Sequence, residues 1–206
     1  MKVMLINGSP NKEGCTYTAL HEVETSLQKH GIKTEIMYLG KQPVSGCIAC
    51  GACQKTGWCA VNDKVNELLE QLSDIDGIVI GSPVHYASAS GQITSFLDRV
   101  FFAGSGRWTN KLGAAVVSCR RGGASAAFDQ LNKYFTINSM PVVASQYWNQ
   151  VHGFTPDDVQ QDLEGLQTMR TLANNMAWLL ASVEAGRKAG VPLPEIEETI
   201  FTNFIR

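Results

Sequence analysis

Short apolar runs alternate with segments of helical spacing along most of this chain of 206 residues. Strands are predicted over the apolar runs 2–7, 34–39, 77–81, 113–119 and 141–145. Apolar residues at intervals of three or four predict helices over 16–30, 63–72, 92–102, 124–135 and 157–184. Strands that alternate with helices are joined by crossovers rather than hairpins. The pattern therefore predicts an α/β protein with a parallel sheet and helices on both faces.

Five such strands with right-handed crossovers allow the doubly wound order 2-1-3-4-5. Residues 1–186 are expected to form the domain. Residues 187–206 are expected to form a C-terminal tail used for packing or for an interface. Doubly wound sheets bind ligands outside the carboxyl ends of their strands. The loops that follow these strands are rich in Gly, Ser and Cys, so the functional site is expected at this edge.

The charge and apolar patterns exclude several function classes. Charged residues make up 17% of the chain and the formal net charge is −2, so no basic face for nucleic acid is expected. No apolar run has the roughly 18 residues of a membrane span. The start of the sequence lacks the apolar stretch and cleavage site of a signal peptide. We therefore expect a cytoplasmic protein that binds neither nucleic acid nor a membrane.

The loop after the first strand has the composition of a phosphate-binding loop. Its small residues allow the backbone N–H groups to converge, and the helix that follows directs its positive end to the same point. The candidate ligands are Ser9, Asn11, Gly14, Cys15 and Thr16. The loop lacks both Gly-Lys-Ser/Thr and G-x-G-x-x-G, which excludes a nucleoside triphosphate loop and a dinucleotide fingerprint. An ordinary strand-to-helix turn is the alternative.

Two further loops suit a planar ring. The loop after the third strand places the pair His85 and Tyr86 among small residues, and the loop after the fourth strand combines two arginines with two glycines. Apolar and aromatic groups cover flat rings, glycines permit close backbone approach, and arginines neutralise negative charge. The candidates are Pro83, Val84, His85, Tyr86, Ser118, Cys119, Arg120, Gly122 and Gly123. Flexible surface connections are the alternative.

These motifs resemble those of the NADPH-dependent FMN reductase family, whose fold is flavodoxin-like. The resemblance rests on Ser-Pro-x-x-x-Gly-x-Thr at 9–16, Ser-Pro-Val-x-Tyr at 82–86, Phe-Leu-Asp-Arg at 96–99 and Gly-Gly at 122–123. It implies that FMN binds with its phosphate on the first loop and its ring between the other two. Cys15 departs from the Asn of many relatives, so a backbone contact is expected there rather than a side-chain contact. Asp98 and Arg99 are expected to form an ion pair at a helix end.

Four cysteines fall within thirteen residues of the loop 40–62, at positions Cys47, Cys50, Cys53 and Cys59. Such a cluster in a cytosolic protein indicates metal or redox chemistry rather than structural disulfides. Two-residue gaps allow the thiolates to face one centre, so all four could hold a [4Fe–4S] cluster. The compact motif resembles that of the iron–sulfur flavoproteins, a branch of the same family.

Two alternatives for these cysteines remain open. The loop could be a metal-free lid over the flavin, with a redox-active disulfide pair. A zinc site is less favoured, because zinc usually takes two separated pairs of cysteines. The loop follows the second strand, whose carboxyl end shares an edge with the phosphate loop. We therefore expect it to shape access to the flavin.

The family resemblance implies an FMN-dependent oxidoreductase. It would oxidise NAD(P)H and reduce a small acceptor such as a quinone, a nitro or azo compound, or free flavin, with no protein residue required as a general acid or base. The alternative is an electron-transfer protein of the iron–sulfur flavoprotein or flavodoxin kind that exchanges electrons with ferredoxin. A ligand-sensing regulator is a third class, but no DNA-binding motif supports it.

Aromatic residues outside the expected core predict a homodimer or homotetramer, because a monomer would expose them. They are Trp58, Phe101, Phe102, Trp108, Tyr147 and Trp148.

Overall fold

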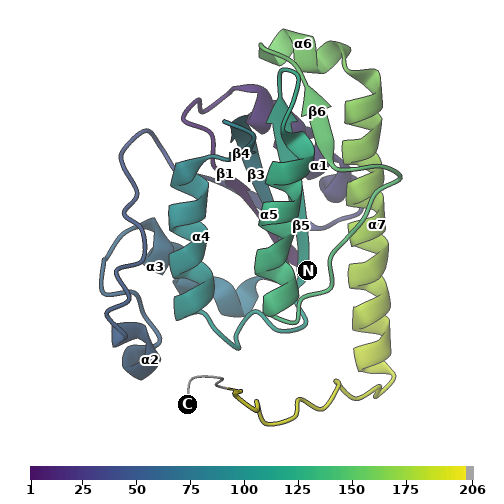
Figure 1. Ribbon diagram of the computed structural model, residues 1–206. Coiled ribbons are helices and arrows are strands. Elements are labelled where there is room, and N and C mark those ends of the chain that lie inside the picture. Colours follow the sequence, from purple (N-terminus) through teal and green to yellow (C-terminus); the bar gives the residue numbers. More distant parts are fainter. Residues whose placement is uncertain (203–206) are drawn as a thin grey trace.

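The computed structural model describes residues 1–202, so the last four residues of the predicted tail lie outside the described part. Its parallel strands are β1 (Lys2–Asn7), β2 (Lys33–Tyr38), β3 (Gly77–His85), β5 (Leu112–Cys119) and β6 (Gln150–His152). They form a sheet in the order β2-β1-β3-β5-β6, which confirms the predicted doubly wound, flavodoxin-like fold (Figure 1). A short strand β4 (Ser88–Ala89) pairs antiparallel with the end of β3.

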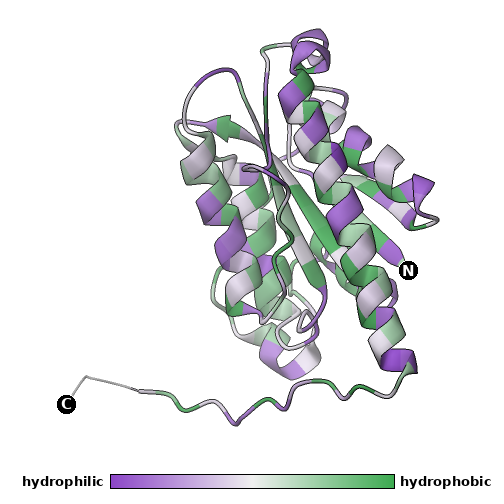
Figure 2. Cartoon of the chain, turned by 90° about the vertical axis from the view of Figure 1, so that its right-hand side faces the viewer, coloured by the Kyte–Doolittle hydropathy of each residue, from purple (hydrophilic) through white to green (hydrophobic). Residues whose placement is uncertain are grey.

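Helices cover both faces of the sheet. They are α1 (Cys15–Lys29), α2 (Ala52–Thr56), α3 (Lys64–Glu70), α4 (Gly91–Ala103), α5 (Ala124–Ile137), α6 (Pro156–Gln161) and α7 (Leu163–Lys188), with a 3₁₀ turn at Leu72–Asp74. Along β1, Val3 and Leu5 pack toward α1 and α7, whereas Met4 and Ile6 pack toward α3, α4 and α5. All four side chains are fully buried, as a strand between two helical layers requires. Figure 2 shows these apolar strands between the helices.

The predicted fifth strand at 141–145 is wrong. Val142 forms only an isolated bridge with Gly113, and the strand that pairs with the carboxyl end of β5 is β6. Pro141 has no N–H to donate, and the chain leaves the sheet after Val143 donates to the Gly113 carbonyl at 2.8 Å. The next contact with the sheet begins at Gln150, where pairing to Val117 resumes.

The predicted helix 157–184 is two helices that meet at Asp162. Its carboxylate accepts hydrogen bonds from the backbone N–H of Gly165 at 2.9 Å and of His152 at 2.7 Å. The first bond caps α7, and the second ties the corner to β6, so the chain turns at this residue.

The loop 40–62 contains the short helix α2, which the sequence pattern did not predict. Gly51 and Gly57 flank α2 with φ values of 69° and 75°, a left-handed conformation that favours glycine. The loop runs along α4 from its first turn to its last (Figure 1). The Gln92 side chain donates to the Gly40 carbonyl at 2.8 Å near the start of α4, and Cys47 shares a groove with Phe102 near its end.

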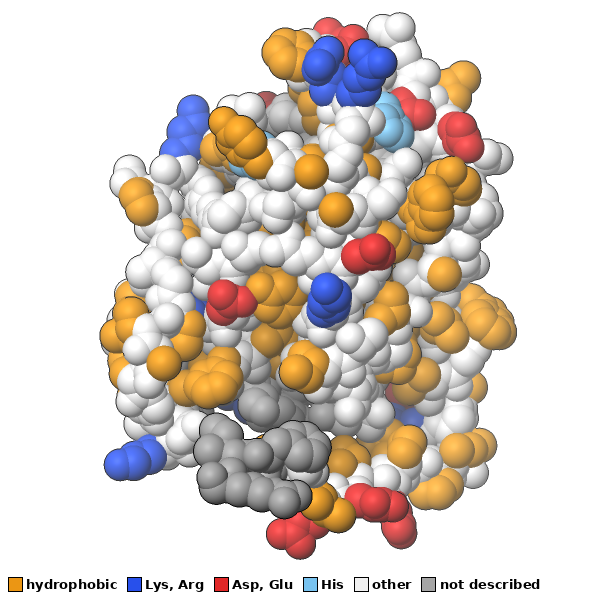
Figure 3. Space-filling model, viewed as in Figure 1, with side chains coloured by type: hydrophobic (Ala, Val, Ile, Leu, Met, Phe, Trp, Pro, Cys, Tyr) orange, Lys and Arg blue, Asp and Glu red, His pale blue; other side chains and the backbone are white. Residues whose placement is uncertain are grey.

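The aromatic residues predicted to lie outside the core divide into two groups. Phe101 and Trp108 are buried, so the prediction is wrong for them. Trp58, Phe102, Tyr147 and Trp148 are 40–53% exposed. Figure 3 shows further apolar side chains on the face that α4, α5 and α7 present. After α7, the described tail residues 189–202 form no helix or strand. Among the described helices, none has both the length and the apolar composition to cross a membrane.

Candidate functional site

Three loops at the carboxyl edge of the sheet are tied directly to one another. The hydroxyl groups of Thr16, at the start of α1, and Ser118, at the end of β5, are 2.8 Å apart. The Ser90 hydroxyl, at the start of α4, donates to the Gly8 carbonyl at 3.0 Å. These two bonds join the loops after β1, β3 and β5. The structure therefore gathers at one edge all the residues that the sequence proposed for a flavin.

The loop after β1 is shaped by short side chains. The backbone N–H of Ser9 donates to the Asn7 side chain at 3.1 Å, and the N–H of Asn11 donates to the Ser9 hydroxyl at 3.1 Å. The Asn7 amide also donates to the Lys12 carbonyl at 3.0 Å. Asn7 is fully buried and was missed by the sequence analysis, although a polar residue that ends an apolar strand was the available signal.

The first turn of α1 has the features of an anion site. Its N-cap is Gly14, and no side chain in the described structure caps the helix. A helix start without a side-chain cap leaves backbone N–H groups that a phosphate can satisfy. A Cβ atom at Gly14 would lie 3.0 Å from the Cβ of Asn11, so a larger residue would crowd the loop.

The end of β3 forms a strained hairpin. Tyr86 and Ala87, at its tip, have φ values of 51° and 58°. Two consecutive positive values match the two-residue turns that close hairpins, but non-glycine residues adopt them at a cost. The Gln130 side chain of α5 holds the hairpin by accepting hydrogen bonds from the Ser88 hydroxyl at 2.7 Å and the Ala89 N–H at 3.0 Å. The Tyr86 side chain is fully exposed at the tip, where it can cover a flat ligand.

Gly123 allows the loop after β5 to approach this hairpin. Its φ is 89°, and a Cβ atom there would lie only 2.6 Å from the Cα of Ala87. No other residue type fits this contact without moving one of the loops. Arg120 and Gly122, which precede Gly123, are exposed at the same edge.

The two cysteines at this edge are not set up as nucleophiles. Burial raises the pKa of the Cys15 thiol, whose Sγ lies 3.7 Å from the Gly153 carbonyl oxygen. Burial likewise raises the pKa of Cys119. The Cys15 side chain is directed to Gly153, so only its backbone N–H is available to a ligand in the loop after β1.

The four clustered cysteines line one cavity beside α4. Cys47 and Cys50 are exposed, whereas Cys53 and Cys59 are partly buried against the core. All four carry free thiols. Within residues 1–202, no three His, Cys, Asp or Glu side chains are spaced to hold a single metal ion. An iron–sulfur cluster does not require the thiolates to meet at one metal ion, because each thiolate binds a different iron atom.

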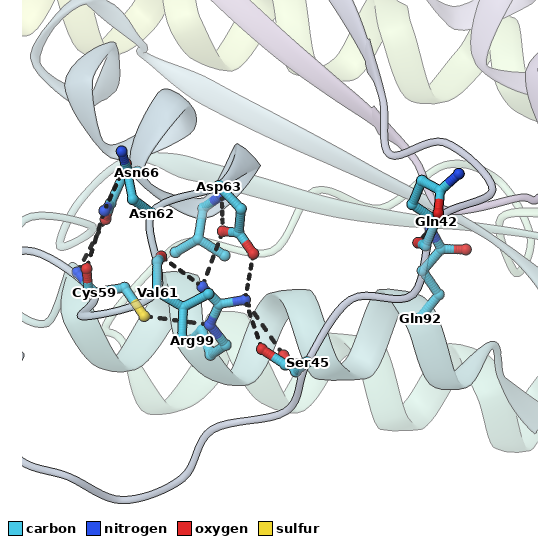
Figure 4. A network of polar contacts seen from close by, with 10 residues as sticks. Gln42, Ser45, Cys59, Val61, Asn62, Asp63, Asn66, Gln92 and Arg99 are labelled. Carbon is cyan, nitrogen blue, oxygen red and sulfur yellow. Dashed lines mark hydrogen bonds and ion pairs between the residues drawn. The ribbon is translucent and has the colours of Figure 1, made fainter.

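A buried arginine organises this loop. The Arg99 side chain, only 1% exposed, donates hydrogen bonds to both carboxylate oxygens of Asp63, at 2.7 and 2.9 Å (Figure 4). Its Nε donates to the Cys59 sulfur at 3.2 Å. Burial works against the charge, but hydrogen bonds to Asp63 and Cys59 outweigh it and raise the pKa of Arg99. Asp63 also caps α3, accepting from the Val65 N–H at 3.0 Å.

The expected ion pair between Asp98 and Arg99 is wrong, because adjacent helical residues point in different directions. Asp98 instead accepts a hydrogen bond of 2.5 Å from the Tyr134 hydroxyl. Burial, together with this carboxylate, raises the pKa of Tyr134.

The cysteine cavity lies away from the carboxyl edge. Its walls include Arg99, Phe102 and Ala103 from the second half of α4, whereas Ser90 at the start of α4 contacts the phosphate loop. Twelve residues of helix separate Ser90 from Phe102, or about 18 Å. The four cysteines of this chain therefore do not lie over its own carboxyl edge, and an effect of the loop on access to the flavin stays a prediction.

A doubly wound sheet with three interlocked loops at its carboxyl edge defines a protein of the flavodoxin-like class. The chain belongs to the NADPH-dependent FMN reductase family, which its residues 1–155 match. Fold and family together make it a flavin-binding oxidoreductase.

A named relative supports the family, and solved structures of low sequence identity share the fold. An iron–sulfur flavoprotein of Methanocaldococcus jannaschii is 35% identical over 185 residues, which cover 86% of this chain and 96% of that protein. A flavodoxin from the domain Archaea has a similar structure, with a TM-score of 0.58 and 16% identity over 88% of this chain and 99% of the other. An NAD(P)H:quinone oxidoreductase from Methanothermobacter marburgensis gives a TM-score of 0.66 and 14% identity over 85% and 96%.

Proposed function

We propose that this chain is an iron–sulfur flavoprotein that transfers electrons, with FMN at the carboxyl edge and a [4Fe–4S] cluster on Cys47, Cys50, Cys53 and Cys59. The observation that carries the proposal is that all four cysteines of one loop line a single cavity. The 35% identity to an iron–sulfur flavoprotein over most of both chains supports it.

The chain's own residues can supply contacts for the phosphate and for the ring of a flavin. The loop from Ser9 to Thr16 and the first turn of α1 would hold the phosphate through Ser9, Asn11 and backbone N–H groups. The hairpin at 83–86 and the loop at 118–123 would hold the ring, with Arg120 near its negative charge. When bound, FMN supplies hydride and one-electron chemistry, and an iron–sulfur cluster supplies one-electron transfer.

The cysteine cavity fits a cluster in its donors and its lining. Four thiolates complete the ligand set of a [4Fe–4S] cluster. Phe102, Ala103 and Val61 supply apolar walls, and the left-handed glycines Gly51 and Gly57 form the turns on either side of α2. The chain has no other group of cysteines that could supply these ligands.

The two sites open on different parts of the surface, so each is accessible to a partner of its own. Tyr86 and Arg120 are exposed at the carboxyl edge, and Cys47 and Cys50 are exposed beside α4. A one-electron carrier such as ferredoxin suits the cysteine side. Exposed apolar residues such as Phe102 and Trp178 support a homodimer or homotetramer, which would bring the cysteine side of one copy toward the flavin edge of another.

Reduction of a small acceptor by NAD(P)H is the second candidate. The observation that favours it is the exposure of His85, Tyr86 and Arg120 at the flavin edge, which leaves room for a nicotinamide and a small acceptor. Quinones, nitro or azo compounds, and free flavin are the acceptors that such an open edge accommodates.

Anaerobic turnover distinguishes the two candidates. The parent protein, loaded with FMN and reconstituted with iron and sulfide, is mixed either with reduced ferredoxin or with NAD(P)H and a quinone. We expect ferredoxin to exchange electrons with the parent and to lose this exchange in a Cys50→Ser/Cys53→Ser variant that keeps FMN. Steady NAD(P)H consumption at equal rates in both proteins, without ferredoxin oxidation, would establish the reductase instead.

A further inference from the structure

Arg99 makes more contacts with the cysteine loop than its ion pair requires. Besides both oxygens of Asp63, its guanidinium donates to the carbonyl of Val61 at 2.9 Å and to the carbonyl of Ser45 at 3.3 Å. Its Nε is turned to the Cys59 sulfur at 3.2 Å (Figure 4). The side chain is 1% exposed, so these acceptors take the place of the water molecules that the cation loses on burial.

These contacts close the segment that contains the four cysteines. Ser45 precedes Cys47, and Val61 and Asp63 follow Cys59, so one side chain fixes both ends of the segment to the same turn of α4. The planar guanidinium reaches these acceptors at once because its five N–H donors point in fixed directions. A lysine ammonium at this position could pair with Asp63, but it could not also reach Cys59 and Ser45 in this geometry.

We propose that Arg99 is a positioning residue for the cluster, and that its hydrogen bond to the Cys59 sulfur raises the reduction potential of the cluster. The inference rests on the proposed function, because it takes Cys59 as a cluster ligand. Reduction adds one electron from an external one-electron donor to the cluster, and no bond is made or broken in the protein. A cationic donor on a ligand sulfur stabilises the more negative, reduced form.

Arg107 provides a matched control on the same loop. Its guanidinium donates to the Gly57 carbonyl at 3.4 Å and to the Leu69 carbonyl at 2.6 Å, and lies 5.6 Å from the centre of the Trp58 ring. It therefore supports the loop at Gly57 and Trp58, without a hydrogen bond to a cysteine. A change at Arg107 tests loop support alone, and a change at Arg99 tests loop support together with the bond to sulfur.

The first experiment compares Arg99→Lys with Arg107→Lys after anaerobic reconstitution. FMN, iron and sulfide contents are measured, and the midpoint potential of the cluster is followed by electron paramagnetic resonance during a titration with dithionite. We expect Arg99→Lys to keep FMN and to shift the potential to a more negative value. A tenfold shift of the one-electron equilibrium corresponds to about 59 mV. Arg107→Lys should keep the parent potential. A full cluster at the parent potential in Arg99→Lys would overturn the proposal.

The second experiment needs no change at Arg99 and so does not depend on the folding of that variant. The parent is labelled with ¹⁵N-arginine, and the reduced cluster is examined by pulsed electron paramagnetic resonance. We expect a ¹⁵N coupling from an arginine that persists in labelled Arg107→Lys. The absence of such a coupling in a protein that contains the cluster would overturn this inference alone. A parent without iron and sulfide would overturn the proposed function together with it.

Discussion

The carboxyl edge of the sheet and the cysteine loop are built in different ways. At the edge, three loops that follow three strands are tied together by the pairs Thr16–Ser118 and Ser90–Gly8, and Gly123 permits their closest approach. The cysteine loop is attached to the side of α4 chiefly through Arg99, and two of its four cysteines are exposed. The strand ends and their loops therefore form the proposed flavin site, whereas the proposed cluster site is held chiefly by one buried side chain.

Loss of the proposed cluster ligands should have the largest effect. This effect should be confined to the cysteine loop. In Cys50→Ser/Cys53→Ser, we expect iron and sulfide to disappear while FMN content stays at the parent level, because the two regions share no residue. Colorimetric iron and sulfide assays and the flavin absorbance measure both. As a control, Cys15→Ser changes a cysteine outside the cavity, and this variant should have the same iron content as the parent. Loss of FMN together with iron in the double variant would contradict the separation.

A negative charge in the phosphate loop should affect only the flavin. Ser9 is 5% exposed and shapes the loop through the Asn11 N–H. We expect Ser9→Asp to weaken FMN binding by about 1–3 kcal/mol, roughly 5- to 150-fold in Kd, because it repels the phosphate. Flavin fluorescence titration measures this change. Ser73→Asp adds the same charge at an exposed position remote from the loop and should bind FMN as the parent does. Unchanged affinity in Ser9→Asp would show that the phosphate lies elsewhere.

The two neighbouring glycines of the loop after β5 should differ in their tolerance of a methyl group. Gly123→Ala places a Cβ atom 2.6 Å from the Cα of Ala87 at a φ of 89°. We expect a loss of about 1–3 kcal/mol in the free energy of unfolding, with weaker FMN binding. A Cβ atom at Gly122 meets open space, so Gly122→Ala should have little effect. Thermal unfolding and FMN titration test both variants. Equal losses would mean that the two loops are not in contact.

The smallest expected effect is a loss of stability at acid pH, caused by Asp158 in α6, the helix that follows β6. Hydrogen bonds from the backbone N–H groups of Thr155 and Phe154 hold the pKa of Asp158 below its ordinary value. The stabilisation is therefore complete above the unfolded-state pKa and is lost as the pH falls through the lower folded-state pKa. The difference in unfolding free energy between the parent and Asp158→Asn should shrink on acidification. A constant difference down to the acid range would contradict this assignment.

Much of the fold followed from local patterns. Four of the five predicted strands and the phosphate loop depend on apolar periodicity and small residues, which act over a few positions. The edge strand was predicted at 141–145 instead of 150–152. Both segments are short, and Pro141, which has no N–H to donate to a sheet, was the one local signal against the first segment. Apolar runs at a sheet edge carry less information than buried central strands.

The cysteine site shows more clearly what the sequence could not predict. The spacing of the four cysteines was sufficient to predict the ligand set that we propose. The course of the loop could not be predicted, since it depends on Gln92 reaching Gly40 and Arg99 reaching Asp63 across 36 or more positions. Arg99 stood in a motif that predicted a helix-end ion pair, and only the folded structure shows that its partners are on the cysteine loop.

The most direct test of the two proposed sites is the cofactor content of the parent protein. The chain is purified without oxygen, reconstituted with iron and sulfide, freed of excess reagents, and assayed for FMN, iron and sulfide per chain. We expect about one FMN with about four irons and four sulfides, the content of a single [4Fe–4S] cluster. The spectrum should show the two flavin bands with a broad brown shoulder. FMN at full occupancy with no iron or sulfide after reconstitution would contradict this expectation.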